Sequence, residues 1–133
     1  MPGYRSLAVW DKAHRATILT LDLVDQLQKT SGVARIADQL VGAVTSIGAN
    51  IAEGYPSRQG GEYRRYLNIA LRSAYETDNW LQVLKDSAII ARHISPDKVR
   101  EIEQLNIEVI KMLRTLIKSI EQKRKCEPKR EDP

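Results

Sequence analysis

The sequence predicts an all-α protein whose four helices form an antiparallel up-down-up-down bundle. Four segments carry apolar residues at alternating steps of three and four, which is the spacing of one buried helix face. Short stretches that contain Gly, Pro or Ser separate these segments, and short connections favour antiparallel neighbours. No segment alternates apolar and polar residues as a half-buried strand does. The 133 residues suggest a single domain.

The first helix is expected from about Ser6 to Lys29, with Ser6 as its N-cap. Its predicted buried face consists of Val9, Ala13, Ala16, Thr20, Leu23 and Leu27. Residues 30–32, with the sequence Thr-Ser-Gly, predict the first turn.

The second helix is expected from about Val33 to Gly54. Its predicted buried face consists of Ile36, Leu40, Ala43, Ile47 and Ile51. Gly42 and Gly48 lie inside the helix, where each costs roughly 1 kcal/mol relative to alanine, so we expect a neighbouring helix to approach closely. Asn50 lies beside the apolar face and requires a hydrogen bond if it is buried. Gly54 is expected to end the helix in the left-handed conformation.

The third helix gives the clearest pattern and should end between Asp86 and Arg92. Its predicted buried face consists of Tyr63, Leu67, Ala70, Ala74, Thr77, Leu81, Leu84 and Ala88. An irregular stretch with two glycines, residues 55–61, precedes it.

The fourth helix has a clear beginning, with Ser95 as N-cap, Pro96 in the first position and Asp97 in the first turn. It should fray near Lys123. Its predicted buried face consists of Val99, Ile102, Asn106, Val109, Leu113, Leu116 and Ile120. The domain is therefore expected to span residues 1–125, and residues 126–133 are expected to form a disordered polar tail.

The composition and the net charge favour a cytoplasmic protein without a membrane partner. Only one cysteine, Cys126, is present, so no intramolecular disulfide can form and a reducing compartment fits. No secretory leader is recognised at the beginning, and no run of 18 apolar residues occurs. The formal net charge of +4 and the pI of about 9.3 permit an acidic partner without requiring one.

The sequence offers no evident metal, cofactor or catalytic site. The two histidines, His14 and His93, do not follow a glutamate at the spacing used by metal sites in bundles. Asp11 precedes His14 by three residues, but no second such pair is present. No glycine loop of the phosphate-binding types occurs, and Cys126 lies in a polar segment without a pocket. We therefore expect that the protein is not an enzyme.

Basic residues at helical spacing are the strongest indication of function. The residues proposed to contact nucleic acid are Arg58, Arg64, Arg65, Arg72, Lys111, Arg114 and Lys118. Several of them repeat at intervals of seven, which places them on common helix faces. Between residues 111 and 125, six basic side chains accompany one acid, Glu121. Such faces fit contacts to phosphates, which provide affinity without reading sequence.

An ordinary solvated helix face gives the same pattern, so two hypotheses stay open. The first is a non-catalytic nucleic-acid-binding module for RNA or DNA. The second is a protein-interaction scaffold without a direct nucleic-acid role. Leu19, Leu21, Tyr66, Leu71 and Trp80 fall off the predicted core faces, and a chain of this size cannot hide them all, which predicts a homo-oligomer.

Three ordered motifs resemble the 23S rRNA intervening-sequence proteins, a family of four-helix-bundle proteins. They are Trp10-x-Lys12-Ala13-His14, the run Ser46-Ile47-x-Ala49-Asn50-Ile51-Ala52-Glu53-Gly54, and Glu62-Tyr63-x-Arg65-Tyr66-Leu67-x-Ile69-Ala70. The likeness covers about residues 6–121. It implies a small bacterial protein that forms a ring-shaped homopentamer.

The related accessory variability determinants of diversity-generating retroelements form basic pentamers that bind nucleic acid and a reverse transcriptase. The resemblance therefore implies RNA or DNA, and a reverse transcriptase or another protein, as partners. This chain departs from the family pattern at Val41 and Gly42, where basic residues are frequent, and at Arg72, where glycine is frequent. Charge is thus removed from the second helix and added to the third.

Overall fold

The computed structural model describes residues 3–27, 31–88 and 92–126 and confirms the all-α bundle. Its elements are the 3₁₀ helix η1 (Gly3–Ser6), α1 (Ala8–Asp25), α2 (Ser31–Gly54), the 3₁₀ helix η2 (Tyr55–Ser57), α3 (Glu62–Asp86) and α5 (Pro96–Cys126). No strand occurs in these ranges. None of the helices described there is both long enough and apolar enough to cross a lipid bilayer. Cys126, predicted as the first residue of a disordered tail, is instead the last residue of α5, and residues 127–133 of that predicted tail lie outside the described residues.

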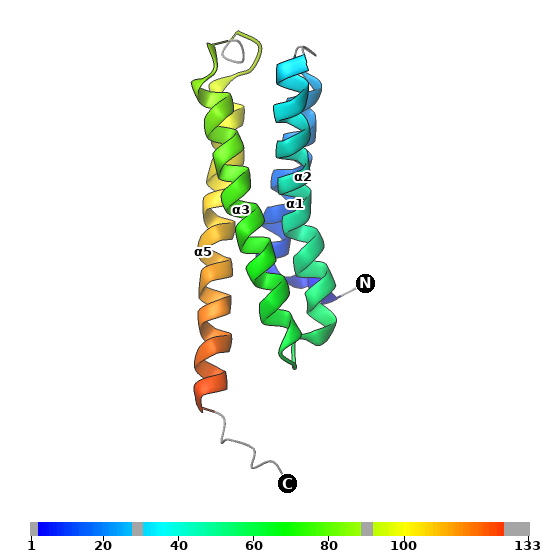
Figure 1. Ribbon diagram of the computed structural model, residues 1–133, viewed down its shortest axis with the longest axis vertical. Helices are drawn as coiled ribbons and strands as arrows, with labels where there is room; N and C mark the ends of the chain where they lie inside the picture. The colour runs from blue at the N-terminus through cyan, green and yellow to red at the C-terminus, as the bar shows by residue number, and fades with distance from the viewer. Residues whose placement is uncertain (1–2, 28–30, 89–91, 127–133) are drawn as a thin grey trace.

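The four long helices form an elongated bundle in which consecutive helices run in opposite directions (Figure 1). α1 packs against α2 and α5, and α3 packs against the same two helices, so the four helices enclose one core. With 31 residues, α5 is the longest helix, and its C-terminal turns extend beyond the connection between α2 and α3 (Figure 1). The end of α5 therefore lies beside the beginning of α3.

The predicted core faces of α1 and α3 are almost entirely confirmed. All six residues predicted for the first helix are buried, and so are seven of the eight predicted for the third. Ala88 is the exception, because α3 ends at Asp86 and Ala88 is exposed beyond it. In α2, Ile36 is only half-buried, and Val44 is buried in addition to the residues predicted.

The core face of α5 departs from the prediction near its C-terminus. Leu116 and Ile120 are half-buried, whereas Ile117 is buried. The prediction continued a strict seven-residue repeat, but a straight helix of 3.6 residues per turn drifts by about 20° in each heptad. Over a helix of this length the buried face therefore moves to the neighbouring residue.

Two helix ends differ from the sequence prediction. Ser6 does not cap α1, because it lies in η1 and its hydroxyl donates to the carbonyl oxygen of Gly3 at 2.6 Å; Leu7 occupies the N-cap without a side-chain bond. α1 ends at Asp25, earlier than predicted. The predicted cap of α5 is confirmed, since the backbone N–H of Asp97 donates to the hydroxyl oxygen of Ser95 at 3.3 Å.

The glycines of α2 have other roles than those predicted. Gly54 is the last helical residue and has a right-handed φ of −77°, so it is not a left-handed cap. A Cβ atom at Gly54 would lie 2.6 Å from the Cβ of Tyr66, so this is where α2 and α3 approach most tightly among the glycines described. A Cβ at Gly42 would meet nothing within 4 Å, and one at Gly48 would only touch the Trp10 indole at 3.5 Å.

We expect Gly54→Ala and Gly42→Ala to change stability in opposite directions. At Gly54 the new methyl group must displace the base of the Tyr66 side chain, which should cost about 1–3 kcal/mol. At Gly42 the methyl group enters open space and removes a glycine penalty, which should add roughly 0.5–1 kcal/mol. Urea unfolding of both variants checks the pair, and a Gly54→Ala variant as stable as the parent would contradict the close approach.

Hydrogen bonds tie the polar residues of α2 and the core into the bundle. The Asn50 amide donates to the Ser46 carbonyl and hydroxyl oxygens at 2.8 and 3.0 Å, which gives it the partners that burial requires. The Ser73 hydroxyl on α3 donates to that of Ser46 at 2.9 Å. Deeper in the core, the Asn106 amide of α5 donates to the Ala74 carbonyl of α3 at 2.9 Å, and its Oδ1 atom is buried without a partner among the described residues.

Candidate nucleic-acid interface

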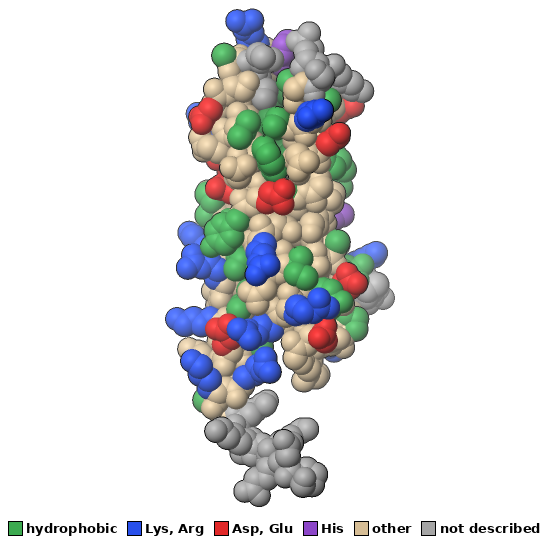
Figure 2. Space-filling view, in the orientation of Figure 1, with side chains coloured by type: hydrophobic (Ala, Val, Ile, Leu, Met, Phe, Trp, Pro, Cys, Tyr) green, Lys and Arg blue, Asp and Glu red, His purple; other side chains and the backbone are tan. Residues whose placement is uncertain are grey.

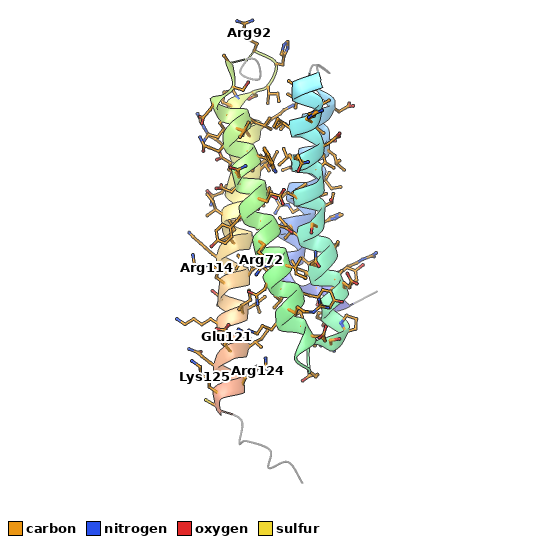
Figure 3. All side chains as sticks on the ribbon, viewed as in Figure 1. Arg72, Arg92, Arg114, Glu121, Arg124 and Lys125 are labelled. Carbon is orange, nitrogen blue, oxygen red and sulfur yellow. The ribbon has the colours of Figure 1, made fainter. Side chains whose placement is uncertain are left out.

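A cavity of about 350 Å³ between α3 and the end of α5 gathers four arginines. Arg64, Arg65 and Arg72 come from α3, and Arg124 comes from α5. The antiparallel order of the two helices produces this arrangement, because the first turns of α3 lie beside the last turns of α5. Figure 2 shows Lys and Arg side chains gathered over this lower part of the molecule, and Figure 3 labels Arg72 and Arg124 there. We call this site the arginine cavity.

Arg64 is held across the two helices by Glu121. Its Nε and Nη2 atoms donate to the same carboxylate oxygen of Glu121 at 3.1 and 2.6 Å. Both side chains are about two-fifths exposed, with values of 40% and 42%, so solvent screens the pair and it adds little to stability. Its main effect is to fix where the Arg64 guanidinium lies.

Arg65 is held by a carboxylate on its own helix. Its Nε and Nη2 atoms donate to one oxygen of Glu62 at 3.1 and 3.0 Å, and its guanidinium lies 4.7 Å from the centre of the Tyr66 ring. The hydrogen bond with Glu62 raises the pKa of Arg65 further above its ordinary value, so this side chain is always charged. It is exposed, which leaves its outer edge open to a ligand.

Arg72 and Arg124 are exposed and have no hydrogen-bond or ion-pair partner among the described residues. Each of them therefore keeps its full set of guanidinium donors for a ligand. Arg72 lies at one end of the arginine cavity.

A second groove adjoins the arginine cavity on the other side of Glu121. Arg114 and Lys118 of α5 line this groove together with Glu121 and with Leu71 of α3. Glu121 therefore lies between the two basic sites, and Figure 3 shows it on α5 between Arg114 and Arg124. The structure thus brings five of the predicted residues into two neighbouring sites: Arg64, Arg65, Arg72, Arg114 and Lys118.

The remaining two predicted residues lie elsewhere. The Arg58 guanidinium lies 4.3 Å from the centre of the Tyr55 ring and donates to the Tyr55 carbonyl at 3.2 Å. Lys111 lines an apolar groove of about 380 Å³ between the beginning of α1 and α5, together with Met112 and Leu116. The spacing of seven placed Arg65 and Arg72 on one helix face and Lys111 and Lys118 on another, but it did not show which neighbouring helix each face meets.

Four of the seven residues that line the arginine cavity were not among the predicted contacts: Gly61, Asn68, Ile69 and Arg124. Of these four, only Arg124 lies in a segment that the sequence marks as basic. The antiparallel order of the helices could have indicated that Arg124 belongs to this site, because it places the last turns of α5 beside the first turns of α3. In the structure that order pairs Arg64 with Glu121, 57 positions later in the chain.

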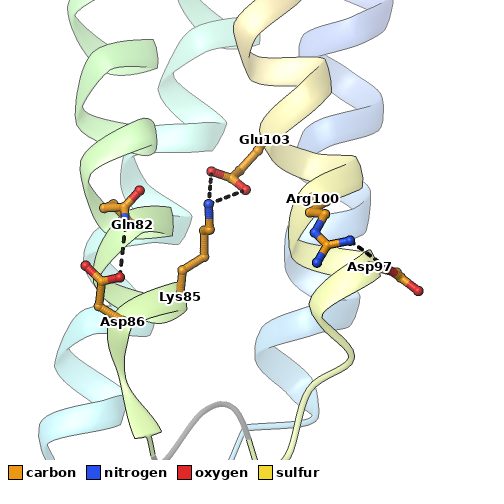
Figure 4. A network of polar contacts seen from close by, with 6 residues as sticks. All are labelled: Gln82, Lys85, Asp86, Asp97, Arg100 and Glu103. Atoms are coloured by element: carbon orange, nitrogen blue, oxygen red, sulfur yellow. Dashed lines mark hydrogen bonds and ion pairs between the residues drawn. The ribbon is translucent and has the colours of Figure 1, made fainter.

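Charge is balanced differently at the opposite end of the bundle. There the Lys85 ammonium of α3 lies 3.2 Å from the Glu103 carboxylate of α5, and Arg100 lies 3.3 Å from Asp97 (Figure 4). The Gln82 amide also donates to Asp86 at 3.0 Å. These basic groups have acidic partners, so the excess positive charge on α3 and α5 belongs to the end that carries the arginine cavity.

The other candidate chemistry gains no support from the described residues. Within them, no three of the His, Cys, Asp and Glu side chains come together as a metal site would require. His14 stacks on Trp10, with ring centroids 4.7 Å apart, and Cys126 is exposed at the end of α5.

Comparison with known proteins identifies relatives of this bundle. Residues 5–115 match the model of a family described as 23S rRNA-intervening sequence protein. A 1.70 Å crystal structure from Bacteroides thetaiotaomicron, described as a protein with unknown function from the S23 ribosomal protein family, has a TM-score of 0.70 and 30% sequence identity. That match covers 84% of this chain and 99% of the other. No protein of curated function matches the chain.

Proposed function

The chain belongs to the 23S rRNA-intervening sequence protein family, and on that premise we propose that it is a non-catalytic protein that binds RNA or DNA. The observation that carries the proposal is the convergence of four arginines from two helices on the arginine cavity. Guanidinium groups match phosphate oxygens in pairs, and their charge attracts a polyanion. The adjoining groove with Arg114 and Lys118 extends this positive surface along α5.

Binding of this kind should be nearly independent of sequence. Arginine donors in the cavity suit phosphate oxygens, which are the same in every nucleotide. Stacking on exposed aromatic rings is the usual basis for reading single-stranded bases, but several rings here already contact one another. Trp10 stacks on His14 and meets the edge of Tyr4, and Tyr55 meets Tyr63.

A salt titration tests the proposal. Fluorescence anisotropy with unrelated RNA and DNA oligomers should give affinities that fall steeply from low to physiological salt. Arg72→Ala/Arg124→Ala should weaken binding and lower the slope of log K against log salt by about 1.4–1.8, because each lost phosphate contact contributes roughly 0.7–0.9. No binding of either polymer by the parent at low salt would contradict the proposal.

The matched control for that experiment is Arg35→Ala/Arg100→Ala. Both arginines are exposed and lie towards the opposite end of the bundle, so this variant loses the same charge. It should keep the parent's salt slope to within the error of the titration. An equal loss of affinity in both double variants would show that net charge alone determines binding and that the arginine cavity is not the site.

We further propose that the protein assembles into a homo-oligomer, with five copies favoured by the family resemblance. Support comes from large apolar side chains at the surface of the single chain. Exposed fractions are 46% for Ile18, 42% for Leu21 and 48% for Tyr75. Sedimentation equilibrium at micromolar concentration should give a mass several times the 15.1 kDa of one chain, and a species of that single mass would contradict the proposal.

A protein-interaction scaffold is the second candidate function. The apolar groove lined by Lys111, Met112 and Leu116 favours it, because an apolar groove with a basic rim suits a protein segment better than a nucleic acid. A reverse transcriptase or another protein would then be the partner. If the parent protein binds no nucleic acid but captures a protein partner in an affinity pull-down, the result would support the scaffold function.

A further inference from the structure

We propose that the arginine cavity binds a phosphate monoester, which is the group found at a phosphorylated end of a nucleic-acid strand or on a free nucleotide. This inference deepens the proposed function of the same site. It distinguishes a terminal phosphate from the diester phosphates inside a strand. Three features of the cavity support it: its net charge, the arrangement of its donors and the composition of its remaining walls.

The net charge of the cavity matches a monoester better than a diester. Four guanidinium groups surround it, and the two carboxylates bound to them, Glu62 and Glu121, leave a net charge of two positive units. A phosphate monoester carries about −1.5 to −2 at pH 7, whereas an internal diester carries one negative charge. One monoester therefore neutralises the site, and one diester leaves it positive.

The donors are divided into a fixed pair and an unpaired pair. Arg64 and Arg65 each direct Nε and Nη2 at a carboxylate, so each keeps the Nη1 atom for another acceptor. Arg72 and Arg124 keep all their donors, as far as the described residues show. A monoester presents three terminal oxygens, each with more than one lone pair, and such an acceptor can use donors from several directions. An internal diester presents only two unesterified oxygens.

The remaining walls of the cavity suit the nucleoside that carries the phosphate. Asn68 donates its amide N–H to the Arg64 carbonyl at 3.0 Å, so its Oδ1 atom is the acceptor that it can offer in the cavity. Arginine has no acceptor, so Asn68 is suited to a sugar hydroxyl or a base N–H group beside the phosphate. Ile69 adds an apolar wall, and the volume of about 350 Å³ lies at the lower end of the range of small-ligand sites.

The test compares oligonucleotides that differ only at their ends. One fluorescent single strand is prepared with a 5′-phosphate, with a 3′-phosphate and with hydroxyl groups at both ends, and anisotropy is measured near physiological salt. We expect a terminal phosphate at one of the two ends to strengthen binding roughly tenfold or more. Arg72→Ala/Arg124→Ala should abolish this gain, whereas Arg35→Ala/Arg100→Ala should preserve it.

The outcomes separate this inference from the proposed function. Equal affinity for phosphorylated and hydroxyl-ended strands would overturn the monoester site and leave sequence-independent nucleic-acid binding intact. A gain that survives in Arg72→Ala/Arg124→Ala would also overturn it, because the end would then bind elsewhere. No binding of any strand, together with displacement of a fluorescent nucleotide by adenosine monophosphate, would overturn the proposed function and support the monoester site.

The same competitor distinguishes the two sources of a monoester. Adenosine monophosphate that displaces the phosphorylated strand at a concentration similar to the strand's own Kd would assign the cavity to free nucleotides. A requirement for concentrations at least a hundredfold higher would assign it to strand ends, where the adjoining groove with Arg114 and Lys118 adds contacts to the chain. Both results support a monoester ligand.

Discussion

Leu67→Asp should abolish the cooperative thermal unfolding of this protein. Leu67 is completely buried in the core of α3, with an exposed fraction of 0%. The substitution removes a large apolar side chain, which alone costs about 2–5 kcal/mol, and places an unpaired carboxylate in the space. The whole domain is stabilised by only about 5–15 kcal/mol. Circular dichroism should show a broad loss of helix in place of a sharp transition.

Asn79→Asp is the control for that variant. Asn79 is an exposed residue of the same helix and has no hydrogen-bond partner among the described residues, so a new carboxylate there stays in water. Its melting temperature should lie within a few degrees of the parent's, since surface substitutions usually change stability by about 0.5 kcal/mol or less. A Leu67→Asp variant that melts like the control would contradict the assignment of the core.

Asn106→Asp should destabilise the protein strongly at neutral pH and much less at acid pH. The Asn106 amide is 1% exposed and donates to the Ala74 carbonyl at 2.9 Å. A carboxylate in its place cannot donate and would bring a buried charge against that carbonyl oxygen. We expect the free energy of unfolding to fall by about 3–5 kcal/mol at pH 7, which is the cost of an uncompensated buried charge.

The direction in which stability changes with pH follows from the pKa of the introduced carboxyl group. Burial raises the pKa of an introduced carboxyl above its unfolded value of about 3.9, because the charged form loses its hydration. Below that value the group is protonated in both states, and its O–H can donate to Ala74. As pH rises above it, the unfolded state loses its proton first and stability falls until the folded pKa is passed. Urea unfolding of variant and parent at pH 4 and pH 7 measures this difference, and a pH-independent loss would contradict it.

The core could be predicted from sequence because burial and helical spacing are linked directly. Val9 to Leu23 in α1 and Tyr63 to Leu84 in α3 follow the spacing of one helix face, and the structure buries them. The face of α5 was predicted less well near Ile117, because a rigid seven-residue repeat ignores the drift of a straight helix. The N-cap of α5 could be recognised from the sequence because Ser95 and Pro96 are both residue types that favour the beginning of a helix.

Features that depend on two segments together were not recoverable in the same way. The sequence predicts only that Gly54 ends a helix. The close approach between α2 and α3 is seen in the structure, where Tyr66 packs against Gly54. The arginine cavity likewise depends on the length of α5, which brings Arg124 beside the beginning of α3. Periodicity described each basic face but could not indicate that Glu121 would hold Arg64 across the helix interface.

The extension of α5 beyond the other helices has a consequence for hydrogen exchange. Every residue from Gln122 to Cys126 is exposed, so the amide protons of these turns should exchange through local fraying long before those near Leu113 exchange through global unfolding. Arg124 lies in these turns, so a ligand that it contacts should hold the last turns of α5 in the helical state. Slowed exchange of these amides would therefore report occupancy of the cavity through the backbone of α5, and part of the binding free energy would offset the fraying of the helix.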